Sequence, residues 1–394
     1  MYNALSSIDE VFICANITLT SGSDFYHKAE NGVKHYYIPS KEAHAVSNPS
    51  KKTIDYVVNA ILENNPDLIH VWGMELNWGI MMGDRRLLHI KKLLEIQGIK
   101  SVYAESQYYM GGLGRSEILE MRSALQAILP IKRVESQQKS YKKWRAKEKQ
   151  ILSNIPNINT QSEWVRIVIP SMFDNLQLKT FETGIILRSG FMETSPWFSV
   201  HKREDHPAIF TTTSSLPYKA LHVTIKAFKL IKRNYPSAIL YVAGMTKWNP
   251  NLIKGGYSKY IYSLINELSL EDSVVFMGNL TEKEMLEQMY KADVFVMSSF
   301  VETYCLALAE ALALGIPTVS SNSTALKELV RDGENGLAYP TGDHYLCAQK
   351  IMTLLKDSAL SYKLSEAAST SYRKEKSKEK AVEKQLATYR ELLG

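Results

Sequence analysis

Residues 293–320, DVFVMSSFVETYCLALAEALALGIPTVS, decide the fold of this chain. The apolar run from Asp293 to Met297 is typical of a buried strand, and Leu306 to Leu314 forms an uninterrupted apolar helix that Gly315 ends. The run from Pro317 to Ser320 is the next strand. Strand, helix and strand in this order build a parallel sheet with crossover helices, so the segment predicts a doubly wound α/β domain.

The same alternation continues on both sides of this segment. In the second half we expect strands at Ala208–Thr213, Ala238–Ala243 and Ser273–Met277, and helices at Lys219–Arg233, Lys259–Leu268 and Glu282–Lys291. In the first half we expect strands at Glu10–Ala15, Lys34–Ile38, Asp67–Trp72 and Lys100–Ala104, and a helix at Lys51–Asn64. The chain therefore predicts two similar domains.

Breaks in the pattern place the domain boundaries. Ser195-Pro196 and His206-Pro207 interrupt the stretch from Ser189 to His206, where we expect the hinge. The predicted domains are 1–195 and 196–370, and 371–394 is a charged helix that must pack on a folded domain. Tyr2 to Ser7 resembles the end of a helix, so the first domain is expected to lack its opening strand and Gly-rich turn.

Composition excludes several classes of protein. The 394 residues are 45% hydrophobic and 22% charged, which excludes a disordered chain. The three cysteines form no CxxC pair, so neither a disulfide framework nor a zinc knuckle is encoded. With no leader pattern and no run of about 18 apolar residues, we expect a cytoplasmic protein.

The net charge of +6 is concentrated between Pro130 and Gln150, where eight Lys or Arg stand against two Glu. Two interpretations are open: a solvated helix face, or a face on which Tyr141 and Trp144 help to meet anionic lipid or a polyanionic substrate. Nothing else in the chain favours nucleic-acid binding.

Two glutamates stand where a doubly wound domain binds ligands. Glu302 follows a strand, and Glu310 lies on the helix after it, whose N-terminus attracts anions. Capping plus an ordinary surface glutamate is the alternative. A second candidate, Gly111-Gly112-Leu113-Gly114, has Glu117 where a dinucleotide fingerprint needs glycine, and we expect a plain turn there.

The segment resembles the E-x7-E motif of retaining glycosyltransferases of family 4. That family has the GT-B fold, two Rossmann-like domains facing across a cleft, with the C-terminal helix packing back on the first. Three further segments are similar to family motifs, firmly from about 205 to 355 and more weakly before: SSLPYKALHVTIKA at 214–227, NGLAYP at 335–340 and NPDLIHVWG at 65–73.

The resemblance implies a role for each matching residue. Lys219 stabilises the departing diphosphate, Glu310 binds the ribose hydroxyls and Glu302 contacts the sugar. Backbone groups beside Glu302 line the donor: Thr303, Tyr304, Cys305 and Leu306. Family members need no metal, and this chain lacks the Asp-x-Asp pair of metal-dependent enzymes, so no cofactor is expected.

The sequence also departs from the family pattern. Ser214 replaces an arginine that many members carry, and Ala220 replaces the glycine after the lysine. A histidine that many members place after the fourth strand of the first domain is absent, and Glu105 is a candidate to replace it at the acceptor. His70 is either an acceptor-side residue or a structural histidine.

The resemblance implies transfer of a hexose-type sugar from a UDP- or GDP-linked donor, with retention at the anomeric carbon. The implied acceptor is a saccharide or lipid-linked saccharide in capsule, O-antigen or exopolysaccharide assembly, at the inner face of the membrane. The alternative is a degenerate, non-catalytic GT-B partner or nucleotide-binding subunit, which the departures favour. A nucleotide-sugar epimerase fits the motif context less well.

Overall fold

The computed structural model describes residues 13–30, 32–44, 48–128, 133–200, 206–246 and 256–394. The chain forms two compact units. Unit 1 comprises Met1–Ser101, Ser140–Ile186 and Lys376–Gly394, and unit 2 comprises Val102–Lys139 and Leu187–Glu375. The units cut across the sequence division at 195 and 370, because residues 102–139 join the second unit and the last helix joins the first.

Unit 2 is built on a six-stranded sheet whose ladders are all parallel, in the order β10-β9-β8-β11-β12-β13. The order reverses between β8 and β11, so this sheet is doubly wound. Apolar side chains that are almost fully buried form each strand. The strands are β8 (Ala208–Thr212), β9 (Ile239–Ala243), β10 (Val274–Gly278), β11 (Val294–Met297), β12 (Thr318–Ser321) and β13 (Leu337–Tyr339).

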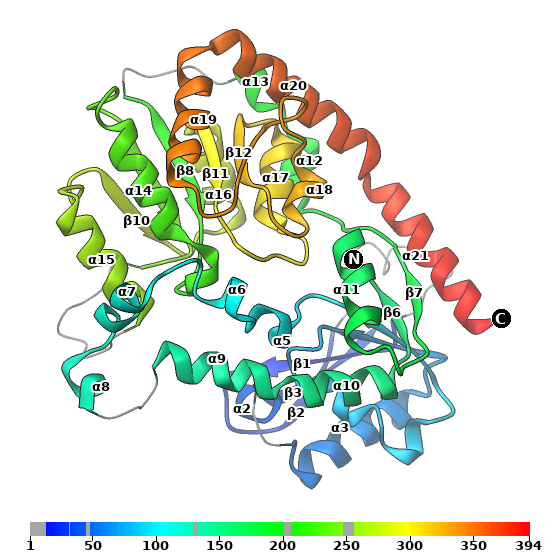
Figure 1. Ribbon diagram of the computed structural model, residues 1–394. Helices are drawn as coiled ribbons and strands as arrows, with labels where there is room; N and C mark the ends of the chain where they lie inside the picture. The colour runs from blue at the N-terminus through cyan, green and yellow to red at the C-terminus, as the bar shows by residue number, and fades with distance from the viewer. Residues whose placement is uncertain (1–12, 31, 45–47, 129–132, 201–205, 247–255) are drawn as a thin grey trace. The chain divides into compact units, whose positions relative to one another are not determined.

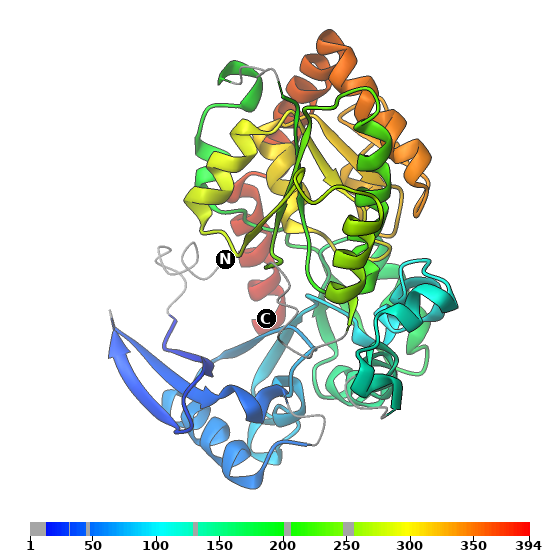
Figure 2. The same cartoon turned by 90° about the vertical axis from the view of Figure 1, so that its left-hand side faces the viewer.

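Helices cover both faces of this sheet, with α14 and α19 on one face and α16 and α17 on the other (Figures 1 and 2). The main helices are α14 (Leu221–Ile231), α15 (Tyr257–Glu267), α16 (Glu282–Lys291), α17 (Leu306–Leu314), α18 (Leu326–Leu329), α19 (His344–Lys356) and α20 (Ser358–Glu375). The strands and helices expected in this half are confirmed to within two residues at most ends. Lys219 itself lies in a preceding 3-10 turn, η2 (Pro217–Lys219), rather than in the helix.

Unit 1 contains two sheets. A four-stranded sheet, β4-β5-β6-β7, is parallel throughout, and a three-stranded sheet, β1-β3-β2, pairs β2 and β3 as an antiparallel hairpin. The strands are β1 (Ala15–Thr20), β2 (Tyr26–Glu30), β3 (Val33–Pro39), β4 (Leu68–Trp72), β5 (Lys91–Glu95), β6 (Asn157–Asn159) and β7 (Lys179–Phe181). The principal helices are α3 (Lys51–Asn64), α10 (Arg145–Asn154), α11 (Glu163–Met172) and α21 (Lys378–Leu393).

Two strand predictions in the first half are wrong. Residues 100–104 form a helix, α5 (Lys100–Tyr103), and the strand of this region is β5. Lys92 interrupts the apolar run of β5, yet this lysine is buried and its ammonium donates to the carbonyls of Leu87 and Ile90. The strand expected at Glu10–Ala15 begins only at Ala15, and the helix end expected at Tyr2–Ser7 lies outside the described residues.

The predicted hinge and tail also differ in detail. The hinge segment holds two short helices, α12 (Ser189–Glu193) and α13 (Trp197–Val200), before residues outside the described part. The tail is two helices, because Ser377 ends the run and its hydroxyl caps α21 by accepting from the Lys380 N–H. Along the described residues, no helix is both long and apolar enough to span a bilayer.

Candidate functional site

The candidate site lies at the point of unit 2 where the strand order reverses. Strands β8 and β11 are neighbours there, and the chain leaves them toward opposite sides of the sheet. Ligands of doubly wound sheets bind outside the carboxyl ends of such strands. The loop after β8 carries Lys219, and the loop after β11 carries Glu302. Topology alone therefore brings together two residues that are 83 positions apart.

Lys219 and Glu302 form an ion pair across this point. The Lys219 ammonium donates to Glu302 Oε1 at 2.6 Å, and the side chains are 26% and 10% exposed. Burial by itself lowers the pKa of Lys219, but the neighbouring carboxylate outweighs burial and raises it. The lysine therefore stays protonated at the switch point.

Hydrogen bonds between the two loops hold this pair in place. The Phe300 N–H donates to the carbonyl of Tyr218 at 2.8 Å, and the Ser298 hydroxyl donates to the carbonyl of Ala220 at 2.9 Å. Ala220 adopts left-handed backbone angles, φ 52° and ψ 40°, the region that glycine enters without steric cost. Ala220 fills this conformation between η2 and α14.

The backbone after Glu302 turns sharply into α17. Cys305 precedes the helix with φ 98°, a conformation that strains any residue with a side chain. The Glu302 N–H donates to Thr324 Oγ1 at 2.9 Å, and the Thr324 hydroxyl donates to the Glu302 carbonyl at 3.0 Å. Because the turn fixes the first residues of α17, its unpaired N–H groups lie close to Glu302 in the chain.

The other predicted residues of this turn have different surroundings. Thr303 is buried and its Oγ1 accepts from the Tyr103 hydroxyl at 3.3 Å. The Tyr304 hydroxyl pairs with that of Tyr372 at 2.7 Å, and burial raises the pKa of Tyr304 to about 12. Leu306, by contrast, is 54% exposed although it is apolar. The side chain of Leu306 is thus exposed to solvent, while the buried ring of Tyr304 holds the turn in place.

Glu310 has a partner that sequence reasoning missed. Arg188 donates from Nε to Glu310 Oε1 and from Nη2 to Oε2, each at 2.7 Å. The Glu310 side chain is 4% exposed and that of Arg188 is 37% exposed. Burial raises the pKa of Glu310 and the guanidinium opposes this rise. The only sequence signal for Arg188 is indirect: Ser214 stands where many family members carry an arginine, so another cation could be expected near the donor site.

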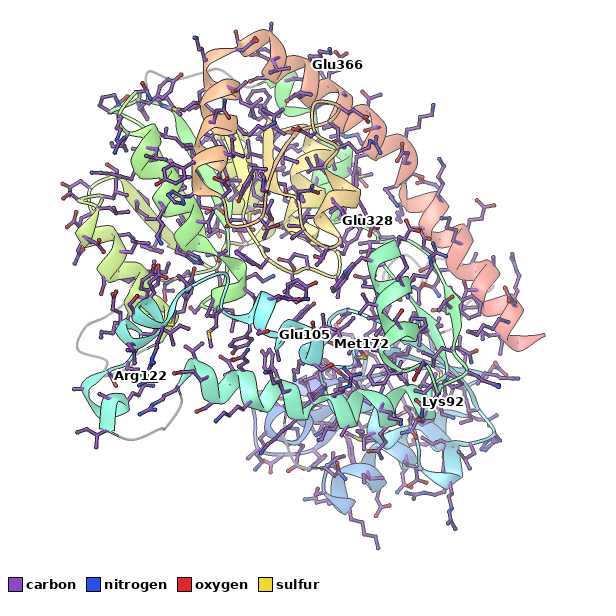
Figure 3. All side chains as sticks on the ribbon, in the orientation of Figure 1. Lys92, Glu105, Arg122, Met172, Glu328 and Glu366 are labelled. Carbon is purple, nitrogen blue, oxygen red and sulfur yellow. The ribbon has the colours of Figure 1, made fainter. Side chains whose placement is uncertain are left out.

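The remaining predicted residues make no contact with the Lys219–Glu302 or Arg188–Glu310 pairs through the hydrogen bonds described below. The Ser214 hydroxyl is buried and has no hydrogen-bond partner among the described residues. Glu105 is the N-cap of α6 (Ser106–Tyr109) and accepts from Gln107 (Figure 3). It follows the helix α5 rather than the expected strand, and its role at an acceptor stays a prediction.

His70 lies in a partly buried polar cluster of unit 1. Its Nδ1 is 2.8 Å from the Tyr389 hydroxyl, and its Nε2 is 3.6 Å from Glu95 Oε2. The ring also stacks on Trp72, with centroids 4.7 Å apart. The Tyr389 contact joins the tail helix α21 to β4 within unit 1, whereas Nε2 has no hydrogen-bond partner among the described residues, so both interpretations of His70 stay open.

The glycine-rich turn docks on the loop that carries Lys219. Gly111 has φ 62°, and a Cβ there would stand 2.4 Å from the carbonyl oxygen of Pro217. The Gly111 carbonyl accepts from Nε2 of His222 at 3.0 Å, and Nδ1 of the same ring accepts from the Tyr257 hydroxyl at 2.8 Å. The turn is therefore a tight packing element, which agrees with the expectation of a plain turn.

Metal ligands do not gather in the part of the chain that the structure describes: no three His, Cys, Asp or Glu side chains there are placed to hold an ion.

Comparison with known proteins connects this geometry to a family. The family model described as "Glycosyl transferases group 1" matches residues 195–371. Glycogen synthase of Mycobacterium tuberculosis is 26% identical over 185 residues, which are 46% of this chain and 42% of that protein. The Salmonella typhimurium protein WcaL, named as a putative colanic acid biosynthesis glycosyltransferase, is 30% identical over 139 residues, 34% of this chain and 32% of its own length. The chain thus spans less than half the length of these relatives.

Solved structures extend the likeness to nearly the whole chain. Sucrose-phosphate synthase of Thermosynechococcus elongatus superposes with a TM-score of 0.67 at 18% identity, covering 96% of this chain and 88% of that one. The Anabaena protein HepE, solved with UDP-glucose, gives 0.61 at 16% identity, covering 86% and 81%. At such identities the likeness shows the fold. The chain therefore has the GT-B fold, and residues 195–371 within it match the family of group 1 glycosyl transferases.

Proposed function

We propose that this chain is a retaining, family 4 glycosyltransferase that moves a hexose-type sugar from a nucleotide diphosphate to a saccharide or lipid-linked saccharide. The observation that carries the proposal is the Lys219–Glu302 ion pair at the switch point of unit 2, within the segment that matches group 1 glycosyl transferases. Relatives named for colanic acid and lipopolysaccharide core biosynthesis support a role in cell-surface polysaccharide assembly. In this proposal unit 2 binds the donor and unit 1 the acceptor.

The proposed chemistry depends on charge that develops at the leaving diphosphate. As the glycosidic bond breaks, its electron pair goes to a phosphate oxygen, and the ammonium of Lys219 stabilises that oxygen. The acceptor oxygen bonds to the anomeric carbon on the same face, and its proton passes to the leaving phosphate. Glu302 orients the sugar, Glu310 the ribose hydroxyls, and backbone N–H groups from Thr303 to Leu306 the phosphates. No metal ion takes part.

The basic segment supports a second part of the proposal, a peripheral contact with anionic membrane. On α9 (Val134–Lys143) and α10, five cations are exposed while Glu148 is buried: Lys139, Lys142, Lys143, Arg145 and Lys149. Trp144 does not belong to this face, because it is buried with the Lys100 ammonium 3.9 Å from its ring centroid. Flotation with vesicles containing phosphatidylglycerol tests the contact, and flotation that does not depend on the anionic lipid refutes it.

Titration calorimetry tests the proposed function before any acceptor is known. We expect the full chain to bind either UDP or GDP in the micromolar range and Glu310→Ala to lose this binding. The matched control is Glu366→Ala, which removes an exposed glutamate of α20 in the same unit (Figure 3). Transfer assays with donors of the chosen nucleotide follow, and the anomeric proton coupling of the product tests retention.

Two outcomes favour the alternative. Absence of binding to either nucleotide contradicts a donor site and favours a non-catalytic GT-B partner. Nucleotide binding without transfer to any saccharide favours a nucleotide-binding subunit. Ser214 is the observation that favours a chain without catalytic activity, because a serine brings no cation to the donor phosphates.

A further inference from the structure

We propose that Arg188 is a positioning residue of the donor site, which holds the Glu310 carboxylate in the orientation and charge state that accept both ribose hydroxyls. This inference rests on the proposed function, because it assigns Glu310 to the ribose. The observation behind it is the two-point hydrogen bond from the Arg188 guanidinium to Glu310, each contact 2.7 Å long. Such paired bonds fix the plane of a carboxylate as well as its position.

The bond leaves Glu310 able to accept further hydrogen bonds. A carboxylate offers about four lone-pair positions, and Arg188 uses one on each oxygen. The two remaining positions suit the two neighbouring hydroxyls of a ribose. Arg188 therefore orients Glu310 without occupying the positions that a ribonucleotide needs.

Arg188 is itself held in place. It is the N-cap of α12, and its guanidinium lies 4.7 Å from the ring centroid of Phe191 one turn further on. Helix α12 packs against α17, which carries Glu310. The pair therefore links two elements of unit 2 at the candidate site.

The groups around Glu310 make Arg188 the source of compensating charge. The acid that acts on Glu310 is Glu282 on α16, and the neutral titratable groups near it are Cys305 and Tyr372. Arg373 of α20 instead donates to the carbonyls of Ala313, Phe191 and Thr194. Without Arg188, burial and the field of Glu282 favour the protonated form of Glu310, which accepts hydrogen bonds more weakly.

The test compares a ribonucleoside diphosphate with its 2′-deoxy analogue by calorimetry, using the full chain at pH 6 and pH 8.5. The ratio of the two dissociation constants reports the ribose contact, and titration of the phosphates cancels in it. Wild type is expected to prefer the ribonucleotide about tenfold at both pH values, since one charge-assisted hydrogen bond is lost. Arg188→Gln is expected to reduce the preference, and to reduce it more at pH 6 than at pH 8.5, because removal of the guanidinium favours the protonated carboxyl.

Two variants sharpen the test. Arg188→Lys keeps the charge but offers a single donor, so its preference is expected to be intermediate and independent of pH. Arg122→Gln is the matched control, because Arg122 pairs with Glu135 at 2.7 Å in the same unit and touches no candidate site residue through that pair (Figure 3). Should Arg188→Gln fail to fold, Arg188→Lys alone decides.

The results separate this inference from the proposed function. A wild-type preference that Arg188→Gln and Arg188→Lys retain at both pH values overturns the inference and leaves the proposed function intact. Equal weakening of ribo- and deoxynucleotide binding at both pH values indicates a structural role and also overturns it. Absence of nucleotide binding by the wild type overturns both.

Discussion

His222 gives unit 2 a sensitivity to acid that can be worked out from its contacts. Its Nε2–H donates to the Gly111 carbonyl and its Nδ1 contacts the Tyr257 hydroxyl, so the neutral ring with its proton on Nε2 has a partner for both nitrogens. Burial lowers the pKa of His222 to about 3. The unfolded chain binds this proton at about pH 6.5, so stability is fully present above that value and falls as the pH drops toward 3.

The expected loss follows from linkage. At pH 4.5 proton binding by the unfolded chain lowers the free energy of unfolding by roughly 3 kcal/mol relative to neutral pH. In His222→Gln this contribution is absent, so its free energy of unfolding should fall less between pH 7.5 and 4.5 by about the same amount. The variant starts from a lower stability at pH 7.5, because Gly111 and Tyr257 lose a partner.

Urea unfolding resolved by hydrogen exchange and mass spectrometry measures this difference. Peptides covering 102–128 and 216–231 report on unit 2 separately from unit 1. Other carboxylates and histidines contribute equally to both proteins, so only the difference between them counts. An identical decrease in the wild type and in His222→Gln would refute the assignment of a neutral, buried imidazole.

Three further predictions concern the candidate site. Lys219→Met and Glu302→Gln should each lower the rate of sugar transfer on the order of a hundredfold, because each removes a charged contact, and a wild-type kcat in both contradicts the site. Gly111→Ala should destabilise unit 2 by about 1–3 kcal/mol more than Gly333→Ala, since both have positive φ but only the first meets Pro217; equal melting temperatures speak against tight docking. Transfer should keep its rate in EDTA, and a rate restored only by added Mg²⁺ or Mn²⁺ contradicts metal independence.

Local signals were sufficient for many elements. Helix α3 has the predicted bounds because Ser50 caps its start by accepting from the Thr53 N–H, and Asn65 ends it in a left-handed conformation with φ 40°. Helices α16 and α17 also have the predicted bounds. For α3 and α16 the capping residues and the apolar periodicity agree, whereas for α17 the length of the apolar run and the glycine after it marked the ends.

Where the sequence misled, the deciding contact was one that the apolar pattern does not encode. Strand β5 contains Lys92, whose burial is possible only because two carbonyls accept from its ammonium. Within the candidate site, the motif pointed to Lys219, Glu302 and Glu310, but Arg188 lies 122 positions before its partner. No periodicity connects residues at that separation, so the second cation of the cluster became visible only in the fold.

The two ion pairs explain how this site keeps two carboxylates beside the N-terminal half of α17. A buried carboxylate without a cation would take up a proton and lose its value as a hydrogen-bond acceptor. Here Lys219 pairs with Glu302 and Arg188 pairs with Glu310, so the two positive and two negative charges cancel without a ligand. The cations also differ in kind: the flexible ammonium can turn to a phosphate oxygen as charge grows there, whereas the planar guanidinium holds its carboxylate rigidly. Under the proposed function, this difference suits Lys219 to the changing charge on the diphosphate and the Arg188–Glu310 pair to the recognition of the donor.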